Sequence, residues 1–566
     1  MKISFISNKY IFLICLLFLF LLITIVYLPL FKGFFQLDEW TFFGDIFSRN
    51  DNFLKTSLGF FAPNKDHYVP IFQIIFYIYI KLFKFNFVTY ALLSILGHLI
   101  VVLLLYLFVL KIFKNKILAF ISSAFFGLSS SLHQATSWVL VDINSHYSAI
   151  FAILSLILFW DFLVGNKSKK LFFSLLFLII SLLIKESAVG FFILYPIVII
   201  LFNGLNIKKQ ISNFLPILLT GLTYLSLRVS MYFIPGAYAE RATVFQMQSI
   251  NNVILNVISF PAKVMLQTIF PPRVFLDISK FATTYLPRWI TGIPGTTRFD
   301  IFVEQVSLQI ISSVALIVIF IIVFRLWQKN GGERLMKLSL FGLFFVVLNS
   351  FIYAFSPGRL GLVALVDSRN LYLPSIGTVI FITSLLAFLT KKMPSRIIIF
   401  ILPLILLQAV SLNKEILKIS KEGGVRKGIL YQIKDDYSKL PNKVVFYTES
   451  DTSFYGMPES EKILPFEVGF GQTLLDWYVL DQKFSRVFFE NKFLWDLTSQ
   501  GYKEDGNQGF GYFRNLDLLK QVILDKHLTV DSIIAYKYYS SSNNLVNITD
   551  ETRGKVLKAL PSSIKP

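Results

Sequence analysis

Long apolar runs constrain the fold of this chain more than any other feature of its sequence. An α-helix needs about 20 predominantly apolar residues to cross a hydrocarbon core of roughly 30 Å. Two apolar stretches, 70–83 and 250–270, are short or interrupted by polar residues, which favours interfacial or re-entrant helices. The other runs predict eleven spanning helices, at 11–30, 88–110, 117–132, 147–163, 171–184, 188–203, 211–233, 308–325, 336–355, 374–390 and 396–412.

The composition supports a polytopic membrane protein. Hydrophobic residues make up 55% of the 566 residues, and the chain contains one cysteine. Charged residues make up 16%, against roughly 25% in soluble domains. We therefore exclude a soluble globular enzyme, a disordered chain and a disulfide-stapled scaffold.

The net charge of +20 is concentrated in the hydrophobic part of the chain. Residues 1–412 hold 33 Lys and Arg against 14 Asp and Glu, whereas residues 413–566 hold 21 against 20. We attribute the excess to cytoplasmic loops that follow the positive-inside bias, and we expect no nucleic-acid partner. Eleven spans put the N-terminus and five basic loops on the cytoplasmic side, whereas thirteen spans would put three of those loops outside. The five loops are 111–116, 166–170, 206–210, 325–334 and 391–396.

The domain organisation follows from this topology. Residues 1–412 are predicted to form a multi-pass membrane domain with two long outer loops, at 31–69 and 234–306. Residues 413–566 are predicted to form an extracytoplasmic domain of the α/β or α+β class. Within it we expect strands at 443–448 and 530–536 and helices at 472–481 and 514–526, because of their residue patterns.

Most of the motif-like polar residues fall on the outer side. Asp38 and Glu39 follow the first span, and paired carboxylates at that place suit a general base or a Mg²⁺ or Mn²⁺ site. The alternative is a solvated pair of loop acids. If the end of loop 129–146 is helical, Asp142 and His146 share one helix face.

His133 and Trp138 precede that pair. The four side chains of this loop suit a phosphate or a sugar, with Trp138 stacking on the sugar ring, or else they form an ordinary interfacial belt. His67, where the first outer loop re-enters the membrane, is a further candidate.

Charged residues also interrupt or follow apolar stretches. Lys185 and Glu186 are either functional residues that pair with each other, or they mark a short outer turn between two helices. The outer segment 356–377 offers Arg359 and Arg369, whose guanidinium forks match phosphate oxygens.

The same segment also holds Asp367 and Tyr372, and an Asp367–Arg369 salt bridge or contact with anionic lipid is the alternative explanation. His98 and Arg228 lie within predicted spans. A lone intramembrane histidine is more often a hydrogen-bonded packing residue than a ligand, so neither residue is a candidate here.

Taken in order, these motifs resemble the GT-C glycosyltransferases, and most closely the protein O-mannosyltransferase branch with its transmembrane-TPR relatives. Gln134 stands where that family's pattern has an acid, and no TPR repeats are present. The matching elements are the acid pair 38–39, HYVPI at 67–71, LLSILGH ending at His98, HQATSW at 133–138, KE at 185–186 and RNLYLPS at 369–375.

This resemblance implies transfer of a single sugar from a polyprenyl-phosphate donor to an acceptor hydroxyl of a protein, lipid or glycan. Asp38 would act as the base with assistance from Glu39, and the anomeric configuration would invert. No metal or other cofactor is expected. The donor phosphate would contact Lys185, Arg359, Arg369 and His133. The sugar or the acceptor would contact His67, Trp138, Asp142, His146, Glu186 and Tyr372.

Three other functions stay open on the sequence. A transporter or flippase of lipid-linked sugars would want broken or polar helices near the bilayer midplane, often in two related halves. A polysaccharide polymerase or ligase would be centred on arginines and a histidine in a large outer loop. A non-catalytic membrane anchor would only display residues 413–566.

Overall fold

The computed structural model describes residues 8–36, 39–49, 52–64, 67–140, 143–165, 167–204, 207–236, 250–355, 365–390, 394–454, 457, 459–466, 469–491, 494, 496 and 499–559. The chain divides into two compact units. We call the first the helical unit; it comprises Met1–Pro29, Leu54–Phe76 and Tyr90–Leu417. We call the second the sheet unit; it comprises Leu30–Phe53, Tyr77–Thr89 and Lys418–Pro566.

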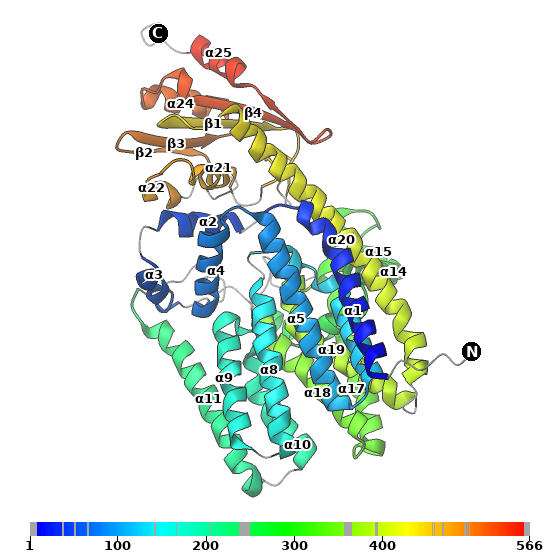
Figure 1. Cartoon of the computed structure of the whole chain (residues 1–566). Helices are drawn as coiled ribbons and strands as arrows, with labels where there is room; N and C mark the ends of the chain where they lie inside the picture. Colours follow the sequence, from blue (N-terminus) through cyan, green and yellow to red (C-terminus); the bar gives the residue numbers. More distant parts are fainter. Residues whose placement is uncertain are drawn as a thin grey trace, which may run out of the picture. The chain divides into compact units, whose positions relative to one another are not determined.

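The predicted membrane fold class is confirmed. Nine helical segments of the described residues are long and apolar enough to cross a membrane, or ten if one bent pair counts as a single span. These segments contain α1 (Asn8–Tyr27), α5 (Phe87–Phe113), α8 (Ile143–Gly165), α10 (Phe191–Asn203), α11 (Ile207–Phe233), α17 (Leu308–Asn330), α18 (Arg334–Ser350), α19 (Ser368–Leu389) and α20 (Pro394–Asp436) (Figure 1).

This count is lower than the eleven spans expected from the sequence. The run 117–132 gives only the 12-residue helix α6 (Lys116–Gly127), which at about 1.5 Å per residue is too short to span. The run 171–184 gives α9 (Ser168–Ile184), with 17 residues. The ambiguous stretch 250–270 forms α13 (Ile250–Ile269), which is followed after a 115° bend by α14 (Pro272–Thr284), as in a broken span or a re-entrant loop.

Shorter helices connect these segments. In the first half of the chain they are η1 (Leu28–Lys32), α2 (Glu39–Ser48), α3 (Phe53–Gly59), α4 (Pro70–Phe83), η2 (Ser130–Leu132), α7 (Gln134–Ser137) and η3 (Glu186–Gly190). Further on they are α15 (Arg288–Thr291), α16 (Thr297–Phe302), the π-helical turn η4 (Val303–Ser307) and η5 (Phe351–Phe355).

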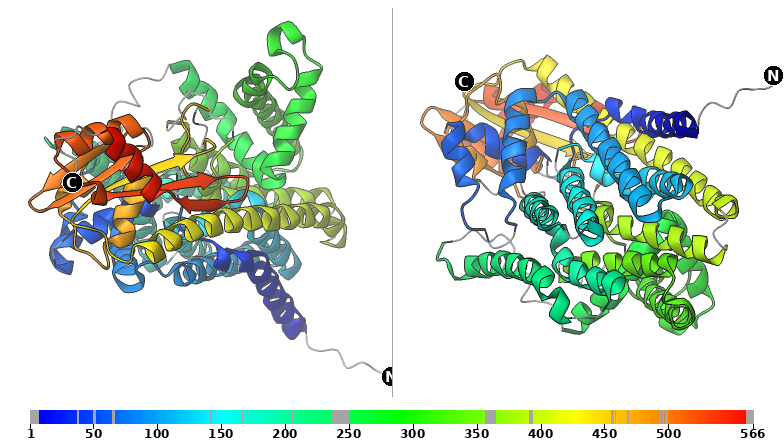
Figure 2. Two further views of the ribbon diagram at one scale, coloured as in Figure 1. Left: turned by 90° about the horizontal axis from the view of Figure 1, so that it is seen from above. Right: turned by 60° about the horizontal axis from the view of Figure 1, so that its bottom comes forward.

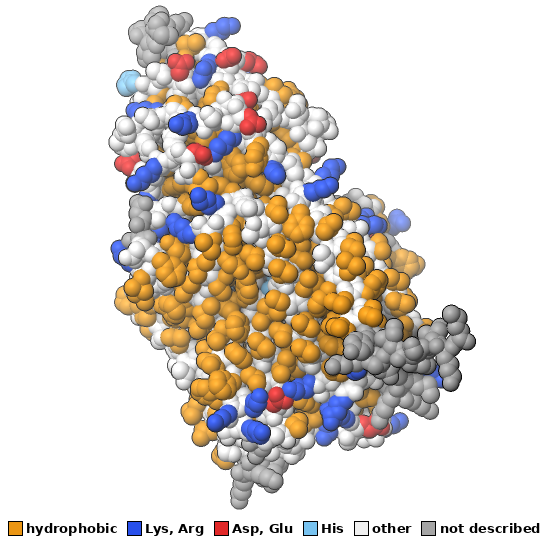
Figure 3. Space-filling view, viewed as in Figure 1, with side chains coloured by type: hydrophobic (Ala, Val, Ile, Leu, Met, Phe, Trp, Pro, Cys, Tyr) orange, Lys and Arg blue, Asp and Glu red, His pale blue; other side chains and the backbone are white. Residues whose placement is uncertain are grey.

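Small residues bring the helices of the helical unit close together. At Gly342 on α18, an added Cβ would lie 2.6 Å from the backbone nitrogen of Phe381 on α19, so only glycine permits this approach. Helices α8 and α9 are joined by serines: Ser155 Oγ donates to the Ser174 carbonyl at 2.6 Å, and Ser181 Oγ donates to the Ser148 carbonyl at 2.8 Å. The outer surface is apolar, as Figure 3 shows for one face.

Three of the predicted cytoplasmic loops meet at one end of the helical unit, which we call the basic end. Asp161, near the end of α8, pairs with Lys111 at 2.5 Å and with Lys170 at 3.9 Å. Arg334, the first residue of α18, donates to the carbonyl of Ile112 at 2.8 Å. Loops 111–116, 166–170 and 325–334 therefore lie on the same side.

The sheet unit contains a five-stranded mixed sheet of order β2-β3-β1-β4-β5, which confirms the predicted α/β region. Strand β1 is parallel to β3 and β4, and the outer strands pair antiparallel. The strands are β1 (Lys443–Ser450), β2 (Gly501–Asp505), β3 (Gln508–Phe513), β4 (Ile533–Tyr539) and β5 (Asn544–Asn547).

Helices cover both faces of this sheet (Figures 1 and 2). Helices α24 (Leu516–Asp525) and α25 (Thr549–Ala559) pack on one face, where Leu519 and Val556 join Val445 and Ile533 in a buried core. Helix α21 (Phe470–Tyr478) packs on the other face through Phe470 and Gly471 against Tyr512. Two short helices, α22 (Arg486–Phe489) and η6 (Val530–Ser532), also belong to this unit.

Candidate functional site

Lys185 links three helices at the end of the helical unit opposite the basic end. It directly follows α9, and its backbone N–H donates to the Ser181 carbonyl at 2.9 Å. Its Nζ donates to Ser145 Oγ at the start of α8, at 2.7 Å, and to the backbone carbonyl of Arg369 at the start of α19, at 3.2 Å. The ammonium is therefore fixed where these helices begin or end.

Arg369 lies beside this ammonium with its own side chain partly exposed. Its guanidinium carbon is 5.1 Å from the centroid of the Trp138 ring, a cation–π distance. Its Nη2 lies 3.8 Å from Asp367 Oδ2, whose side chain is 59% exposed. Two roles were considered for Arg369 from the sequence, phosphate binding and a salt bridge with Asp367. The geometry is compatible with both, because the ion pair is long and exposed.

The backbone before Arg369 is held from two sides. The Gln267 side chain on α13 clamps Val366, donating to its carbonyl at 3.0 Å and accepting from its N–H at 2.9 Å. Ser368 Oγ accepts from the backbone N–H of Gln134 at 3.0 Å. These contacts fix the backbone that leads into Arg369, and no local sequence pattern predicts them.

Glu186 forms a second cluster with the returning end of the first outer loop. Its carboxylate lies 3.0 Å from Arg228 Nε and accepts from the backbone N–H of Tyr68 at 3.3 Å. The exposed ring of His67 reaches within 3.7 Å. Arg228 also donates to the carbonyl of Asn64 at 2.9 Å, so the Glu186–Arg228 pair ties Asn64 and Tyr68 to η3 and α11.

His146 and Tyr372 lie in a buried aromatic cluster with His98. His98 Nε2 lies 3.0 Å from the Gly127 carbonyl, which can only accept, so Nε2 carries the proton and Nδ1 accepts from the Tyr372 hydroxyl at 2.7 Å. The His146 ring centroid is 5.1 Å from that of Tyr372, and His146 Nε2 is 3.2 Å from Thr136 Oγ1. His146 and Tyr372, both predicted to contact the sugar or the acceptor, are fully buried, which favours a packing role.

His133 lies between η2 and α7, partly buried, and its Nδ1 has no hydrogen-bond partner among the described residues. Burial lowers the pKa of His133 to about 4. At neutral pH the imidazole is therefore uncharged, and it can offer a phosphate an N–H group but no positive charge.

The structure thus brings together Lys185, Arg369 and Trp138, and it brings Glu186 to His67. Asp38, Asp142 and Arg359 lie outside the described residues. Within the part that is described, no group of three His, Cys, Asp or Glu side chains has the arrangement of a metal site. Neither Arg228 nor Ser145 was a candidate site residue from the sequence. For Arg228, its charge within a predicted span could have indicated a functional role.

Glu39 is the first residue of helix α2 in the sheet unit, and its side chain contacts the backbone that precedes the helix. Its Oε2 accepts from the backbone N–H of Gln36 at 2.8 Å, and the side chain is fully buried. Arg426 on α20 donates from Nε to the adjacent carbonyl of Phe35 at 3.1 Å. These contacts from both sides fix the backbone that leads into the acidic pair.

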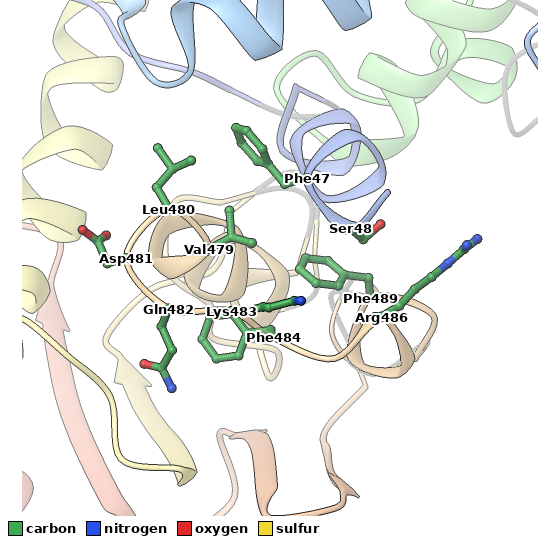
Figure 4. A pocket seen from close by; sticks show the side chains of 10 residues that line it. All are labelled: Phe47, Ser48, Val479, Leu480, Asp481, Gln482, Lys483, Phe484, Arg486 and Phe489. Atoms are coloured by element: carbon green, nitrogen blue, oxygen red, sulfur yellow. The ribbon is translucent and has the colours of Figure 1, made fainter. Parts of the chain in front are cut away.

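A pocket of about 250 Å³ lies at the other end of α2 (Figure 4). Phe47 and Ser48 line it from α2, and the segment 479–484 with Arg486 and Phe489 lines it from the α21–α22 region. Asp481 is paired with Lys434, whereas the Arg486 side chain extends away from the other lining side chains.

Asp476 is buried between α21 and α2. An added Cβ at Gly44 would lie 2.8 Å from its Oδ1, and neither carboxylate oxygen has a hydrogen-bond partner in the described part of the chain. Burial raises the pKa of the Asp476 carboxyl well above its usual range. The carboxyl therefore keeps its proton into a pH range where an exposed aspartate is ionised.

No protein-family model matches the sequence, and a search of curated proteins returned no similar sequence.

Proposed function

We propose that the protein is a membrane glycosyltransferase that moves one sugar from a polyprenyl-phosphate donor to an acceptor hydroxyl. The observation that carries the proposal is the contact of the Lys185 ammonium with the backbone carbonyl of Arg369, whose own guanidinium lies over the Trp138 ring. A fixed ammonium, a partly exposed guanidinium and an indole together suit a phosphate with an attached sugar.

In this proposal the two cations neutralise the charge that develops on the departing phosphate. Charges that are positioned in advance are effective in a water-poor site, where losing one such contact typically costs about 2.7–4 kcal/mol. Arg359 is proposed as a third phosphate ligand from the sequence. His133 would contribute a neutral N–H group.

We propose Asp38 as the general base, from its sequence position and the family resemblance. The acceptor oxygen bonds to the anomeric carbon while its proton passes to the Asp38 carboxylate. The bond from that carbon to the phosphate oxygen breaks, and its electron pair leaves with the polyprenyl phosphate. Attack from the face opposite the phosphate inverts the configuration.

We further propose that the reaction occurs on the outer side of the membrane and that the N-terminus is cytoplasmic. Helices α8 and α9 separate Lys185 from the basic end. Under the positive-inside bias the basic end faces the cytoplasm.

A second candidate, a transporter of lipid-linked sugars, is favoured by one feature. Helices α13 and α14 form a pair bent by 115°, and α13 carries the buried polar residues Asn256, Lys263 and Gln267. Broken helices with polar residues are typical of transporter binding sites. A transporter would move the lipid-linked sugar without joining it to an acceptor.

Mass spectrometry of surface glycans in a deletion strain tests the proposal. Glycans should be lost on deletion and restored by the wild-type chain, but not by Asp38→Asn or Lys185→Met at equal expression. Lys169→Met, which alters an exposed lysine at the basic end, is the matched control and should restore them. Unchanged glycans on deletion, or restoration by Asp38→Asn, would refute the proposal.

A further inference from the structure

A second pocket lies at the basic end of the helical unit, far from the residues assigned above. It has a volume of about 290 Å³ and is formed where α8 and α10 end and α18 begins. Its lining residues are Trp160, Leu163, Val164, Phe202, Asn203, Gly332, Arg334 and Lys337.

The charges in this pocket are positive. Arg334 and Lys337 are the ionisable residues of its lining. Arg334 uses one nitrogen, Nη2, to donate to the Ile112 carbonyl at 2.8 Å, which orients its guanidinium. The Lys337 ammonium lies 6.0 Å from the centroid of the Phe202 ring, at the outer limit of a cation–π contact.

The nearby acid on α8 does not cancel these charges. Asp161 follows Trp160 directly, but its carboxylate is engaged by Lys111 at 2.5 Å and by Lys170 at 3.9 Å. Glu333, the residue before Arg334, is exposed and is absent from the pocket lining. The pocket therefore keeps an excess of positive charge.

The position of the pocket indicates what fills it. It lies at the ends of helices that are long and apolar enough to span a membrane. Val164, which lines the pocket from the last turn of α8, is 78% exposed. Trp160 and Phe202 provide the aromatic surface that is typical of the level of the lipid headgroups.

We propose that this pocket binds the headgroup phosphate of an anionic phospholipid from the leaflet at the basic end. Arg334 and Lys337 would contact the phosphate oxygens, Asn203 would offer its amide to the headgroup, and the acyl chains would lie along the apolar surface of the spanning helices. Basic pockets between spanning helices recognise anionic headgroups in this way. The inference does not depend on the proposed glycosyl transfer.

The test measures lipid binding by the purified full-length chain in detergent, using native mass spectrometry with phosphatidylglycerol or phosphatidylcholine. The wild type should retain phosphatidylglycerol in preference to phosphatidylcholine. Lys337→Ala should weaken phosphatidylglycerol binding about fivefold, since one cation near an anionic surface contributes about 1 kcal/mol. Lys337→Ala leaves the Arg334–Ile112 bond in place.

Two variants separate a specific pocket from general surface charge. Lys337→Arg should restore binding because it returns the positive charge. Lys169→Ala, which removes an exposed cation at the same end but outside the lining, should bind like the wild type.

Equal losses in Lys337→Ala and Lys169→Ala would overturn the proposal, as would equal retention of the two lipids by the wild type. Displacement of the lipid by millimolar inorganic phosphate would also contradict it, because the site would then recognise free phosphate. A Lys337→Ala protein that elutes as one species and keeps its thermal unfolding temperature in lipid-free detergent, yet loses phosphatidylglycerol, would support it.

Discussion

Replacing Gly423 on α20 by alanine should loosen the sheet unit where the first outer loop contacts that helix. A Cβ at Gly423 would lie 2.4 Å from the backbone nitrogen of Phe34 and 3.0 Å from the Cα of Gly33. Both neighbours are backbone atoms, so the segment 33–36 must move by about 1 Å to reach an ordinary contact of roughly 3.4 Å. Such overpacking typically costs about 1–3 kcal/mol, against a gain of about 0.5–1 kcal/mol for alanine in a helix.

The net expectation for Gly423→Ala is a loss of about 0–2.5 kcal/mol in the stability of the sheet unit. Gly428→Ala is the matched control on the same helix, because nothing lies within 4 Å of its added Cβ. It should raise stability by about 0.5–1 kcal/mol through helix propensity alone. Thermal unfolding in detergent, together with the rate of proteolytic cleavage within 30–53, compares the two variants.

The reasoning is refuted if Gly423→Ala unfolds at the same temperature as Gly428→Ala and resists protease equally well. A cleavage rate that rises within 30–53 only in Gly423→Ala would support it. The same variant should also weaken sugar transfer, because the displaced segment leads directly into Asp38 and Glu39.

Three further changes have definite expected outcomes. Glu186→Gln leaves the partly buried Arg228 without its carboxylate partner, so it should lower the stability of the protein by about 1–3 kcal/mol. Thermal unfolding measures this loss, and the double variant Glu186→Gln/Arg228→Met should recover part of it. Asp476→Asn should flatten the pH dependence of stability. Above about pH 4 the Asp476 carboxyl is ionised in the unfolded chain but still protonated in the folded one. The stability of the wild type therefore falls as the pH rises toward the raised pKa of Asp476, by at most about 1.4 kcal/mol per pH unit. Unfolding temperatures of the wild type and Asp476→Asn over pH 5–8 test this. Lys185→Met should lower the rate of sugar transfer about 100-fold or more while leaving the protein folded, which single-turnover transfer measures directly.

Each of these outcomes has a counterpart that would contradict the physical argument. A Glu186→Gln protein as stable as the wild type would mean that the Arg228 charge is solvated without its partner. Parallel pH profiles for Asp476→Asn and the wild type would mean that Asp476 is ionised in the fold. Transfer by Lys185→Met at the wild-type rate would remove Lys185 from phosphate binding.

Much of the fold was predictable because lipid imposes strict rules on sequence. Apolar runs such as 88–110 and 374–390 need about 20 residues to span, and they correspond to α5 and α19. The spanning helix predicted from the apolar run 117–132 was wrong, because the helix ends at Gly127, before the serines at 129–131. Those serines bond to other parts of the helical unit: Ser130 Oγ, for example, donates to Gln408 Oε1 at 2.6 Å.

The candidate site was less predictable, because its contacts join residues far apart in the chain. Lys185 and Arg369 were selected from their unusual outer position, but the carbonyl contact between them spans 184 residues. The Glu186–Arg228 pair and the Gln267 clamp on Val366 likewise depend on tertiary packing, which no local pattern encodes. Similarly, the sequence did not indicate that segments 30–53 and 77–89 group with the C-terminal sheet.

The central claim is that a lipid-linked sugar is joined to an acceptor with Asp38 as the base. The most direct measurement incubates membranes containing the wild-type chain, Asp38→Asn or Lys169→Met with labelled polyprenyl-phosphate sugars and follows the label into acceptors. We expect transfer by the wild type and by Lys169→Met, and a loss of about 100-fold or more for Asp38→Asn at equal expression. Undiminished transfer by Asp38→Asn would contradict the account, as would movement of the labelled lipid across the membrane without transfer.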